Sequence, residues 1–355
     1  MIPRIHGGPD ALGVPRFDFS TNSNACGPCP LALAALNQAD ASHYPDASYT
    51  ALRQQLAAFH DVSPQRVLLA GSASEFIFRL SAAVAQQGGR HVSLPPHSYG
   101  DYAQAAQAWG LGLKATPDAA DLAWACEPSS PLGQAHTTWP QWLLSAASLR
   151  DSSSAATRLQ PAPTPSPLLL DCAYEPLRLQ GTSSLTAAQR AQVWQLWTPN
   201  KALGLTGVRA AYAIAPQGAQ RLVAALERLC PSWPVGAHGV AMLQAWVQPE
   251  VQAWLAGTLP TLRAWKARQI ALLAALGWHC LPSDSNFFCA RLPCMDVLTP
   301  LRAAGIKLRD ATSFGLPGHV RVGVLPPAAQ EALALALSGE SSNEGTLKGT
   351  VGCYY

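Results

Sequence analysis

Short apolar runs alternate with longer amphipathic stretches through the first half of the chain. The apolar runs have the length of buried strands, and the amphipathic stretches have helical periodicity. Ser72 or Ser74 is the expected N-cap of the helix that begins there. Strands that alternate with helices in this way predict a parallel, doubly wound α/β sheet. The expected strands are 66–71, 91–95, 122–128 and 167–174, and the expected helices are 30–38, 48–60, 72–86 and 100–110.

The pattern changes in the last third of the chain. Two helical stretches, 239–257 and 261–277, precede short strands and helices that predict an α+β unit with antiparallel strands. Residues 145–167 are rich in Ser, Ala and Pro and are expected to form a flexible surface loop. The expected parts are an N-terminal arm (1–30), a large domain (31–235), a small C-terminal domain (236–338) and a disordered tail (339–355).

Composition and charge exclude several classes of protein. The 355 residues are 48% hydrophobic and 13% charged, with a net charge of +3 and no basic stripe, so no nucleic-acid partner is expected. The longest apolar runs, such as "IALLAALGWHCL", are too short for a membrane span. The opening "MIPRIHGGPD" lacks the regions of a signal peptide. A cytoplasmic protein is therefore expected.

The nine cysteines are scattered, and most of them are expected to be reduced thiols. "CGPC" at 26–29 matches the thioredoxin redox motif, which requires a preceding strand in a small βαβ unit. Here the motif follows the polar stretch "DFSTNSNA", which favours a loop leading into the helix at 30–38. Redox chemistry remains the alternative. No second CxxC or paired histidine spacing completes a metal site, so none is expected.

Polar side chains follow several predicted strands at the point where each strand ends. In an open α/β sheet, ligands bind at these carboxyl ends. The small residues after the strand at 66–71 also open a helix, which is a natural cradle for a phosphate group. The polar and small residues concerned are Ser72, Ala73, Ser74, Tyr99, Asp171, Tyr174, Thr198, Asn200, Lys201 and Arg209.

This set of side chains suits pyridoxal 5′-phosphate. A lysine amine forms an imine with the cofactor's aldehyde, and a carboxylate keeps the pyridine nitrogen protonated so that the ring accepts electrons. Lys201 and Asp171 are the candidates for these roles. Taken singly, Lys201 fits a solvated surface charge, Asp171 a strand-end residue, and Tyr99 a packing aromatic. Only their joint order along the chain favours a cofactor site.

Several segments in this order resemble the fold type I pyridoxal-phosphate enzymes, which share the aspartate-aminotransferase fold. The resemblance covers roughly residues 5–337 and points to the branch of histidinol-phosphate aminotransferase and L-threonine-O-3-phosphate decarboxylase. It implies a large doubly wound, mostly parallel-sheet domain, a smaller C-terminal α+β domain and a homodimer. The matching segments are "YPD" at 44–46, "GSAS" at 71–74, "LLLDCAYEP" at 168–176, "TPNKALGLTGVR" at 198–209 and "HVRVGV" at 319–324.

The resemblance also implies a role for each matching residue. Lys201 becomes the Schiff-base lysine, Asp171 the partner of the pyridine nitrogen, and Tyr174 the partner of the ring hydroxyl. Tyr99 is implied to stack on the ring, and Tyr44 to reach the neighbouring subunit's cofactor phosphate. The residues implied to hold the phosphate within the subunit are Ser72, Ala73, Thr198 and Arg209.

Two loops depart from the family pattern. "EPSSPLG" at 127–133 puts Ser130 where the family has an asparagine that bonds the ring hydroxyl. Serine is shorter, so the direct contact is expected to be lost or bridged by water. The phosphate loop "GSAS" also lacks the usual asparagine. These changes predict a weaker grip on the cofactor or altered chemistry.

The opening of the chain bears on the substrate. "RIHGGPDALGVPRFDFSTNSNACG" is similar to the threonine-phosphate decarboxylases, in which an early histidine helps to bind the substrate phosphate. His6 and Asn24 are thus implied substrate contacts. Arg321 is implied to hold the substrate α-carboxylate, and Arg309 to be a second anion contact. The simpler alternatives are an ordinary histidine at position 6 and an ion pair of Arg309 with a neighbouring aspartate.

Two reactions remain open for a phosphorylated amino-acid substrate. The bond at the α-carbon that lies perpendicular to the conjugated plane breaks, so orientation decides between loss of carbon dioxide and transfer of a proton. The first expectation is decarboxylation of L-threonine O-3-phosphate to aminopropanol phosphate in cobalamin biosynthesis. The alternative is a histidinol-phosphate-type aminotransferase. A non-catalytic relative or a thioredoxin-like redox module is the third hypothesis.

Overall fold

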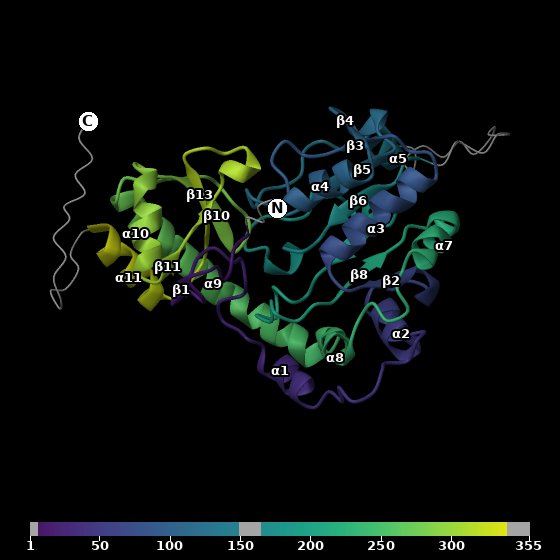
Figure 1. Ribbon diagram of the computed structural model, residues 1–355, viewed down its shortest axis with the longest axis horizontal. Helices are drawn as coiled ribbons and strands as arrows, with labels where there is room; N and C mark the ends of the chain where they lie inside the picture. The colour runs from purple at the N-terminus through teal and green to yellow at the C-terminus, as the bar shows by residue number, and fades with distance from the viewer. Residues whose placement is uncertain (1–5, 149–164, 339–355) are drawn as a thin grey trace.

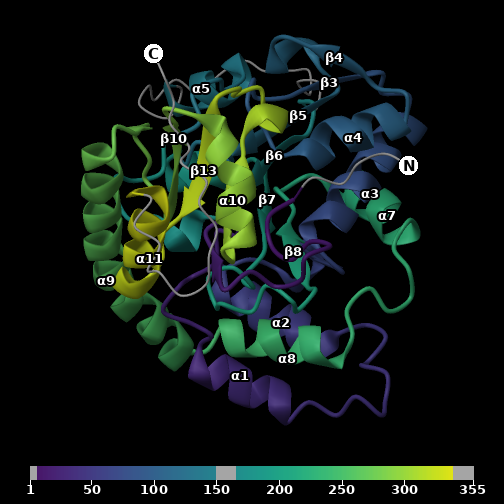
Figure 2. The same cartoon turned by 60° about the vertical axis from the view of Figure 1, so that its left-hand side comes forward.

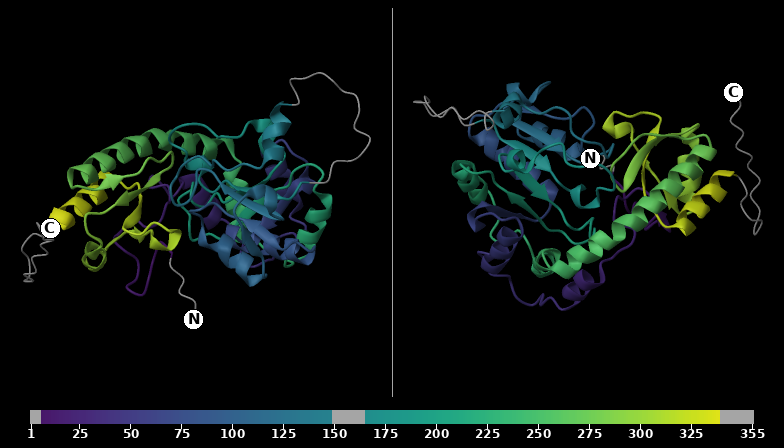
Figure 3. Two further views of the ribbon diagram at one scale, coloured as in Figure 1. Left: turned by 90° about the horizontal axis from the view of Figure 1, so that it is seen from above. Right: turned by 180° about the vertical axis from the view of Figure 1, so that it is seen from behind.

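The computed structural model describes residues 6–148 and 165–338. A large sheet with helices on both faces forms one part, and a smaller C-terminal unit packs beside it (Figure 1). The long helix α9, Pro249–Ala275, runs from the large part to the C-terminal unit, as the view from behind shows (Figure 3). The expected tail at 339–355 lies outside the described residues.

The large sheet has seven strands in the order β2-β8-β7-β6-β5-β3-β4. All neighbours are parallel except β8, which is antiparallel to both β7 and β2. The predicted doubly wound, mostly parallel sheet is therefore confirmed. The chain reverses between β7 and β8, so the loop with Lys201 lies at the carboxyl end of β7. The strands are β2 Val67–Ala70, β3 His91–Ser93, β4 Gly112–Lys114, β5 Leu122–Cys126, β6 Leu168–Asp171, β7 Trp194–Trp197 and β8 Ala211–Ile214.

Helices cover both faces of the large sheet. One face is covered by α3, α4 and α7, whose apolar sides pack around Phe76, Tyr102 and Trp194. The other face is covered by α5 and α6 beside β6, and by α1, α2 and α8 near β2 and β8. These helices are α1 Pro30–Asn37, α2 Thr50–Phe59, α3 Ala73–Gln86, α4 Gly100–Ala108, α5 Gln141–Ser148, α6 Ala187–Arg190, α7 Gln220–Arg228 and α8 Ala237–Trp246.

Helix α3 begins where β2 ends, and its cap explains the position. Ser72 is the N-cap residue, and its Oγ accepts a hydrogen bond from the Glu75 N–H at 3.1 Å. Of the two expected caps, the structure thus selects Ser72. Such a cap stabilises a helix by about 1 kcal/mol. It also fixes the first turn of α3 at the carboxyl end of the sheet.

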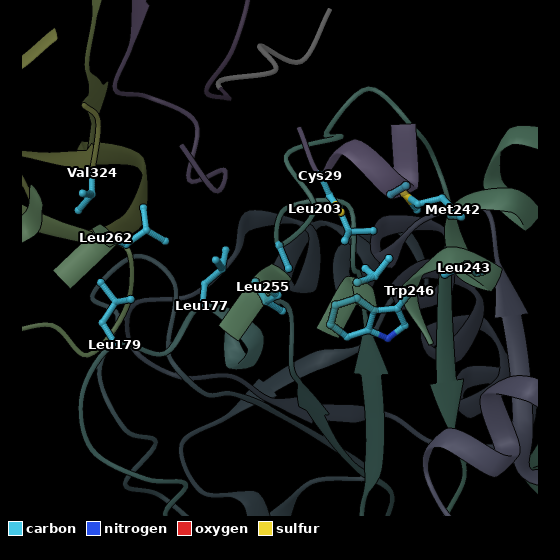
Figure 4. Packing of buried hydrophobic residues seen from close by; sticks show 14 of the residues in the cluster. Cys29, Leu177, Leu179, Leu203, Met242, Leu243, Trp246, Leu255, Leu262 and Val324 are labelled. Atoms are coloured by element: carbon cyan, nitrogen blue, oxygen red, sulfur yellow. The ribbon is translucent and has the colours of Figure 1, made fainter. Parts of the chain in front are cut away.

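The predicted division into helices 239–257 and 261–277 is wrong. Helix α9 begins at Pro249 and continues through Pro260. Proline suits the first turn of a helix, but in the interior it removes a backbone hydrogen bond. Leucines on both sides of Pro260 enter one core that joins the large part to the C-terminal unit (Figure 4). Burial of these side chains outweighs the lost hydrogen bond.

The C-terminal unit is built on a four-stranded sheet of order β12-β13-β10-β9. Its pairings are antiparallel, as predicted. Helices α10 and α11 pack beside it together with α9 (Figure 2). The register places Arg309 opposite Arg321. The elements are β9 His279–Cys280, β10 Phe287–Arg291, α10 Leu298–Ala303, β12 Arg309–Asp310, β13 His319–Gly323 and α11 Pro327–Ser338.

The N-terminal arm is attached to the C-terminal unit. Strand β1, Phe17–Asp18, pairs in parallel with β11, Ile306–Lys307. Asp10 forms ion pairs with Arg302 (Oδ1 to Nη2, 2.7 Å) and with Lys307 (Oδ2 to Nζ, 2.9 Å). Hydrogen bonds from these two side chains hold the pKa of the Asp10 carboxyl well below its usual range. The described part of the arm and the C-terminal unit therefore form one packed body.

Three further expectations concern loops and membrane segments. The loop predicted at 145–167 starts later than expected because α5 continues to Ser148, and 149–164 lie outside the described residues. "CGPC" is a loop that leads into α1, as predicted, with Cys29 at the N-cap and both thiols unpaired. Within 6–148 and 165–338, no helix is both long enough and apolar enough to cross a membrane.

Candidate active site

A cavity of about 1030 Å³ is lined by residues at the carboxyl ends of β5, β6 and β7, by the arm and by the C-terminal unit. Its wall contains every predicted site residue except Tyr44 and Asn24. The fold thus brings together side chains from both ends of the sequence. The predicted residues that line the cavity are His6, Ser72, Ala73, Tyr99, Ser130, Asp171, Tyr174, Thr198, Lys201, Arg209, Arg309 and Arg321.

Asp171 is a buried carboxylate at the end of β6. Its Oδ2 accepts a hydrogen bond from the Tyr102 hydroxyl at 2.7 Å, and its Oδ1 accepts one from the Ala173 N–H at 2.9 Å. Burial raises the pKa of Asp171, while these hydrogen bonds and the Lys201 ammonium oppose the increase. A cation beside Asp171 would stabilise its charged form further. The protonated nitrogen of a pyridine ring is a cation of this kind.

Lys201 lies in the turn that follows β7. Its Nζ is 5.5 Å from the centre of the Tyr174 ring. Asn200 holds the turn, because its Nδ2 donates to the carbonyl oxygens of Thr206 and Val208, both at 3.4 Å. Lys201 is half-buried and lines the cavity. This position differs from that of an ordinary solvated lysine.

One end of the cavity fits a phosphate group. Ser72 and Ala73 place the N-terminus of α3 in its wall, and Arg209 lines the same cavity. The Thr198 hydroxyl is buried and has no hydrogen-bond partner in the described part of the chain. Buried polar atoms without partners are rare in folded proteins. Helix N–H groups, a hydroxyl and a guanidinium are the donors that a phosphate requires.

The aromatic wall of the cavity is built by α4. Tyr99 is the residue before its first turn, and its hydroxyl is hydrogen-bonded to Ser74 Oγ at 3.1 Å. Its ring packs edge-on against Tyr102, with ring centres 5.8 Å apart. Burial raises the pKa of the Tyr99 hydroxyl, which therefore stays neutral. A neutral, packed ring is suited to lie against a planar ligand.

Asn22 is a cavity residue that the sequence reasoning missed. Its Nδ2 donates to the Tyr174 hydroxyl at 3.2 Å, and its buried Oδ1 has no partner among the described residues. The Asn-rich stretch "STNSN" contains several polar residues without periodicity, and the resemblance implies Asn24 rather than Asn22. Nearby, Ser130 Oγ accepts a hydrogen bond from Arg321 Nη1 at 3.4 Å. The serine therefore has a partner other than the expected cofactor hydroxyl.

The opposite end of the cavity is cationic. Arg309 and Arg321 are buried on neighbouring strands, and their guanidinium carbons lie 4.8 and 5.5 Å from the centre of the Phe314 ring. Burial and the charge of Arg321 lower the pKa of Arg309 to about 10. His6 lines the same cavity, with its ring centre 6.4 Å from that of Tyr99. Two close, buried cations favour an anionic ligand.

The two remaining predicted residues lie outside the cavity. Asn24 is buried, and its Nδ2 donates to Ala202 O and Thr258 Oγ1, both at 3.0 Å. It ties the arm to the Lys201 turn and to α9, and its position gives no support to a role in substrate binding. Tyr44 is 78% exposed and stacks on Trp233 with ring centres 4.4 Å apart.

The fold and the site define the class of protein. The doubly wound sheet has an aspartate-aminotransferase-like fold, and the cavity holds a lysine after β7 and a buried carboxylate at the end of β6, side chains that suit pyridoxal 5′-phosphate. The sequence matches the family model for class I and II aminotransferases over residues 15–136 and 164–337. The chain belongs to this family. The predicted fold class, enzyme class and cofactor are therefore confirmed.

Relatives and solved structures give a finer comparison. Histidinol-phosphate aminotransferase of Symbiobacterium thermophilum is 28% identical over 341 residues, which cover 90% of this chain and 89% of that protein. Histidinol-phosphate aminotransferase from Sinorhizobium meliloti, solved in complex with pyridoxal-5′-phosphate, has a TM-score of 0.70 at 20% identity over 90% of both chains. L-threonine-O-3-phosphate decarboxylase from Porphyromonas gingivalis has a TM-score of 0.67 at 20% identity, covering 87% of this chain and 93% of that one.

Proposed function

We propose that this enzyme is a histidinol-phosphate-type aminotransferase that acts on a phosphorylated amino acid or amino alcohol. The observation that carries the proposal is the 28% identity to such an aminotransferase along nearly the whole of both chains. Threonine-phosphate decarboxylation, the first expectation from the sequence, is supported by a structural neighbour at 20% identity, which reflects the fold alone. The comparisons therefore favour the aminotransferase, and the decarboxylase becomes the second candidate.

The roles of the residues follow from their positions. Pyridoxal phosphate, when bound, supplies a ring that withdraws electrons from the substrate α-carbon. Lys201 would hold the cofactor covalently, and its Nζ would carry the proton that leaves the α-carbon. Asp171 would face the ring nitrogen, and Tyr174 the ring hydroxyl. Ser72, Thr198 and the other donors at the phosphate end would orient the cofactor by its phosphate.

The cationic end would bind the anionic groups of the substrate. Arginine binds carboxylate and phosphate oxygens in pairs, and low solvent access strengthens each contact. Arg321 is the candidate for a carboxylate, which is present on amino-acid substrates and on the oxo-acid acceptor. Arg309 and His6 are the candidates for the phosphate.

Substitutions at this end should separate the two anion contacts. Arg321→Ala should lower kcat/KM for every carboxylate substrate. Arg309→Ala and His6→Ala should lower it mainly for phosphorylated substrates. Each lost charged contact should cost about 2 kcal/mol, or roughly thirtyfold in kcat/KM. The measurement is kcat/KM for phosphorylated and plain substrates, with the exposed Arg291→Ala as the control. Equal losses on both substrate types would remove the phosphate assignment.

A comparison of two substrates in separate assays tests the proposed reaction directly. The purified enzyme with cofactor is given histidinol phosphate and an oxo-acid acceptor, or threonine phosphate without an acceptor. We expect formation of the amino acid from the acceptor in the first assay and at least about tenfold slower release of carbon dioxide in the second. Carbon dioxide without an acceptor, at the faster rate, would give the function to the decarboxylase.

One observation supports the decarboxylase as the second candidate. His6 and Gly7 of the decarboxylase-like "HGG" segment both line the cavity. A Cβ added to Gly7 would lie 2.1 Å from the Ser20 carbonyl oxygen, so only glycine fits there. The segment is therefore held against the site, which is where a histidine contact to a substrate phosphate requires it.

The enzyme is also proposed to be a homodimer. Tyr44 is exposed in the single chain and stacks on Trp233, which is itself 44% exposed. An exposed aromatic pair is typical of a protein interface. In the proposed dimer Tyr44 would reach the partner's cofactor phosphate. Sedimentation analysis tests this assembly, and a monomer at working concentration would exclude it.

A further inference from the structure

Tyr102 is a fully buried residue that has no role in the function proposed above. It lies in the first turn of α4, behind the cavity wall, and its hydroxyl donates to Asp171 Oδ2 at 2.7 Å. An O–H to carboxylate bond is charge-assisted and stronger than a neutral hydrogen bond. A buried tyrosine can meet its hydrogen-bonding need at a backbone carbonyl. Here the partner is instead the carboxylate that faces the cofactor ring nitrogen.

Packing fixes the direction of this hydroxyl. The Tyr102 ring stacks on Trp124 with ring centres 4.8 Å apart and planes 10° from parallel. The planes of the Tyr102 and Tyr99 rings meet at 88°. Tyr99 and Tyr102 are three residues apart at the start of α4, so they project from the same side of the helix. One helix turn therefore supplies both the ring that lines the cavity and the donor that holds Asp171.

The surroundings of Asp171 make this donor important. The carboxylate is buried, and within residues 6–148 and 165–338 its hydrogen-bond donors are the Tyr102 hydroxyl and the Ala173 N–H. Lys201 contributes a positive charge, while the thiols of Cys126 and Cys172 are buried and neutral because burial raises the pKa of each. Loss of one of two donors would disfavour the charged carboxylate.

We propose that Tyr102 is a positioning residue that keeps Asp171 ionised and fixes its Oδ2, so that the carboxylate can hold the protonated ring nitrogen of the cofactor. The proposal rests on the role of Asp171 in the proposed function. Tyr102 does not line the cavity, so it acts through Asp171. Removal of its hydroxyl should change the charge state of Asp171 and should leave the cavity shape unchanged.

The first test uses the apoenzyme. Tyr102→Phe keeps the stacked ring and removes the donor. The folded-state pKa of Asp171 is already raised, so its ionisation removes stability as pH rises, and Tyr102→Phe raises this pKa further. The loss in Tm should therefore be larger, by about 3 °C, at about pH 8 than at about pH 5.5. The control Tyr49→Phe removes another buried tyrosine hydroxyl, which is hydrogen-bonded to the Val235 backbone, and should give equal losses at both pH values.

The second test uses the cofactor. Titration of the apoenzyme with pyridoxal phosphate at about pH 8 should show about fivefold weaker binding for Tyr102→Phe than for wild type. In the loaded enzyme, kcat should fall about tenfold while KM for the amino substrate is unchanged. Wild-type affinity and kcat in Tyr102→Phe, or a loss in Tm that does not depend on pH, would overturn the proposal.

A double variant tests whether the charge of Asp171 is the source of the pH dependence. In an Asp171→Asn background residue 171 cannot ionise, so the effect of Tyr102→Phe should no longer depend on pH. A pH dependence that persists in this background would also overturn the proposal. The single variant Asp171→Asn distinguishes a failure of the proposed role of Asp171 from a failure of the proposed role of Tyr102. Normal activity in that single variant would remove the role of Asp171 itself, whereas its inactivity beside a normal Tyr102→Phe would remove only the role of Tyr102.

Discussion

Lys201→Ala is expected to purify without covalently bound cofactor and to show no measurable turnover. The lysine lies in the turn after β7 and lines the cavity within 5.5 Å of the Tyr174 ring centre. An alanine has neither an amine to hold the cofactor's aldehyde nor a base to accept the α-proton. Loss of both functions should lower kcat by a factor on the order of 10⁵ or more. The measurements are borohydride-stable attachment of the cofactor and single-turnover kinetics.

The matched control for this variant is Lys114→Ala. Lys114 is an exposed lysine on β4, away from the cavity wall. It should keep cofactor content and turnover at wild-type levels. The Lys201 assignment fails if Lys201→Ala retains a reducible covalent link and normal turnover. A folded but inactive Lys201→Ala protein with normal near-UV circular dichroism would show that the loss is chemical.

Asp171→Asn should slow the reaction by about a thousandfold or more while the fold is retained. The amide has the size of the carboxylate but no charge, so it cannot stabilise a protonated ring nitrogen. Because burial raises the pKa of Asp171, the apoenzyme of this variant should be no less stable than wild type at neutral pH. Pre-steady-state rates and Tm measure the two effects separately.

The exposed Asp296→Asn is the control, and it should behave as wild type. A rate within about tenfold of wild type for Asp171→Asn would mean that another carboxylate faces the ring nitrogen. Glu75 would then be the next candidate. It lines the same cavity, and burial raises its pKa, although the ion pair with Arg79 opposes that increase.

The sequence predicted β2, β3, β5 and β6 of the large sheet because their patterns are local, but it did not predict β4 and β8. Apolar runs of four or five residues bounded by polar residues predict strands, and this pattern placed Asp171 and Lys201 at strand ends. The course of α9 through Pro260 was not predictable in this way. It depends on leucines that bury themselves against segments from elsewhere in the chain, and that burial overrides the local cost of a proline.

The candidate site was predictable only where a residue has a distinctive chemical role. Tyr102 occupies a position that, in the helical pattern, is typical of a core residue, and its bond to Asp171 spans 69 positions. Asn22 and Asn24 are two residues apart in an irregular stretch, and only the path of the backbone shows that Asn22 lines the cavity. Contacts of this kind depend on the tertiary structure and leave no periodic signal.

The attachment of the arm to the C-terminal unit has a consequence for engineering this enzyme. Strands β1 and β11 are paired, and Asp10 binds Arg302 and Lys307, so the described part of the arm and the C-terminal unit form a single module. His6, Arg309 and Arg321 all belong to that module. A chimera that exchanges substrate preference with a relative must therefore transfer the arm and the C-terminal unit together, since a transplant with one junction would divide the anion-binding residues between two parents.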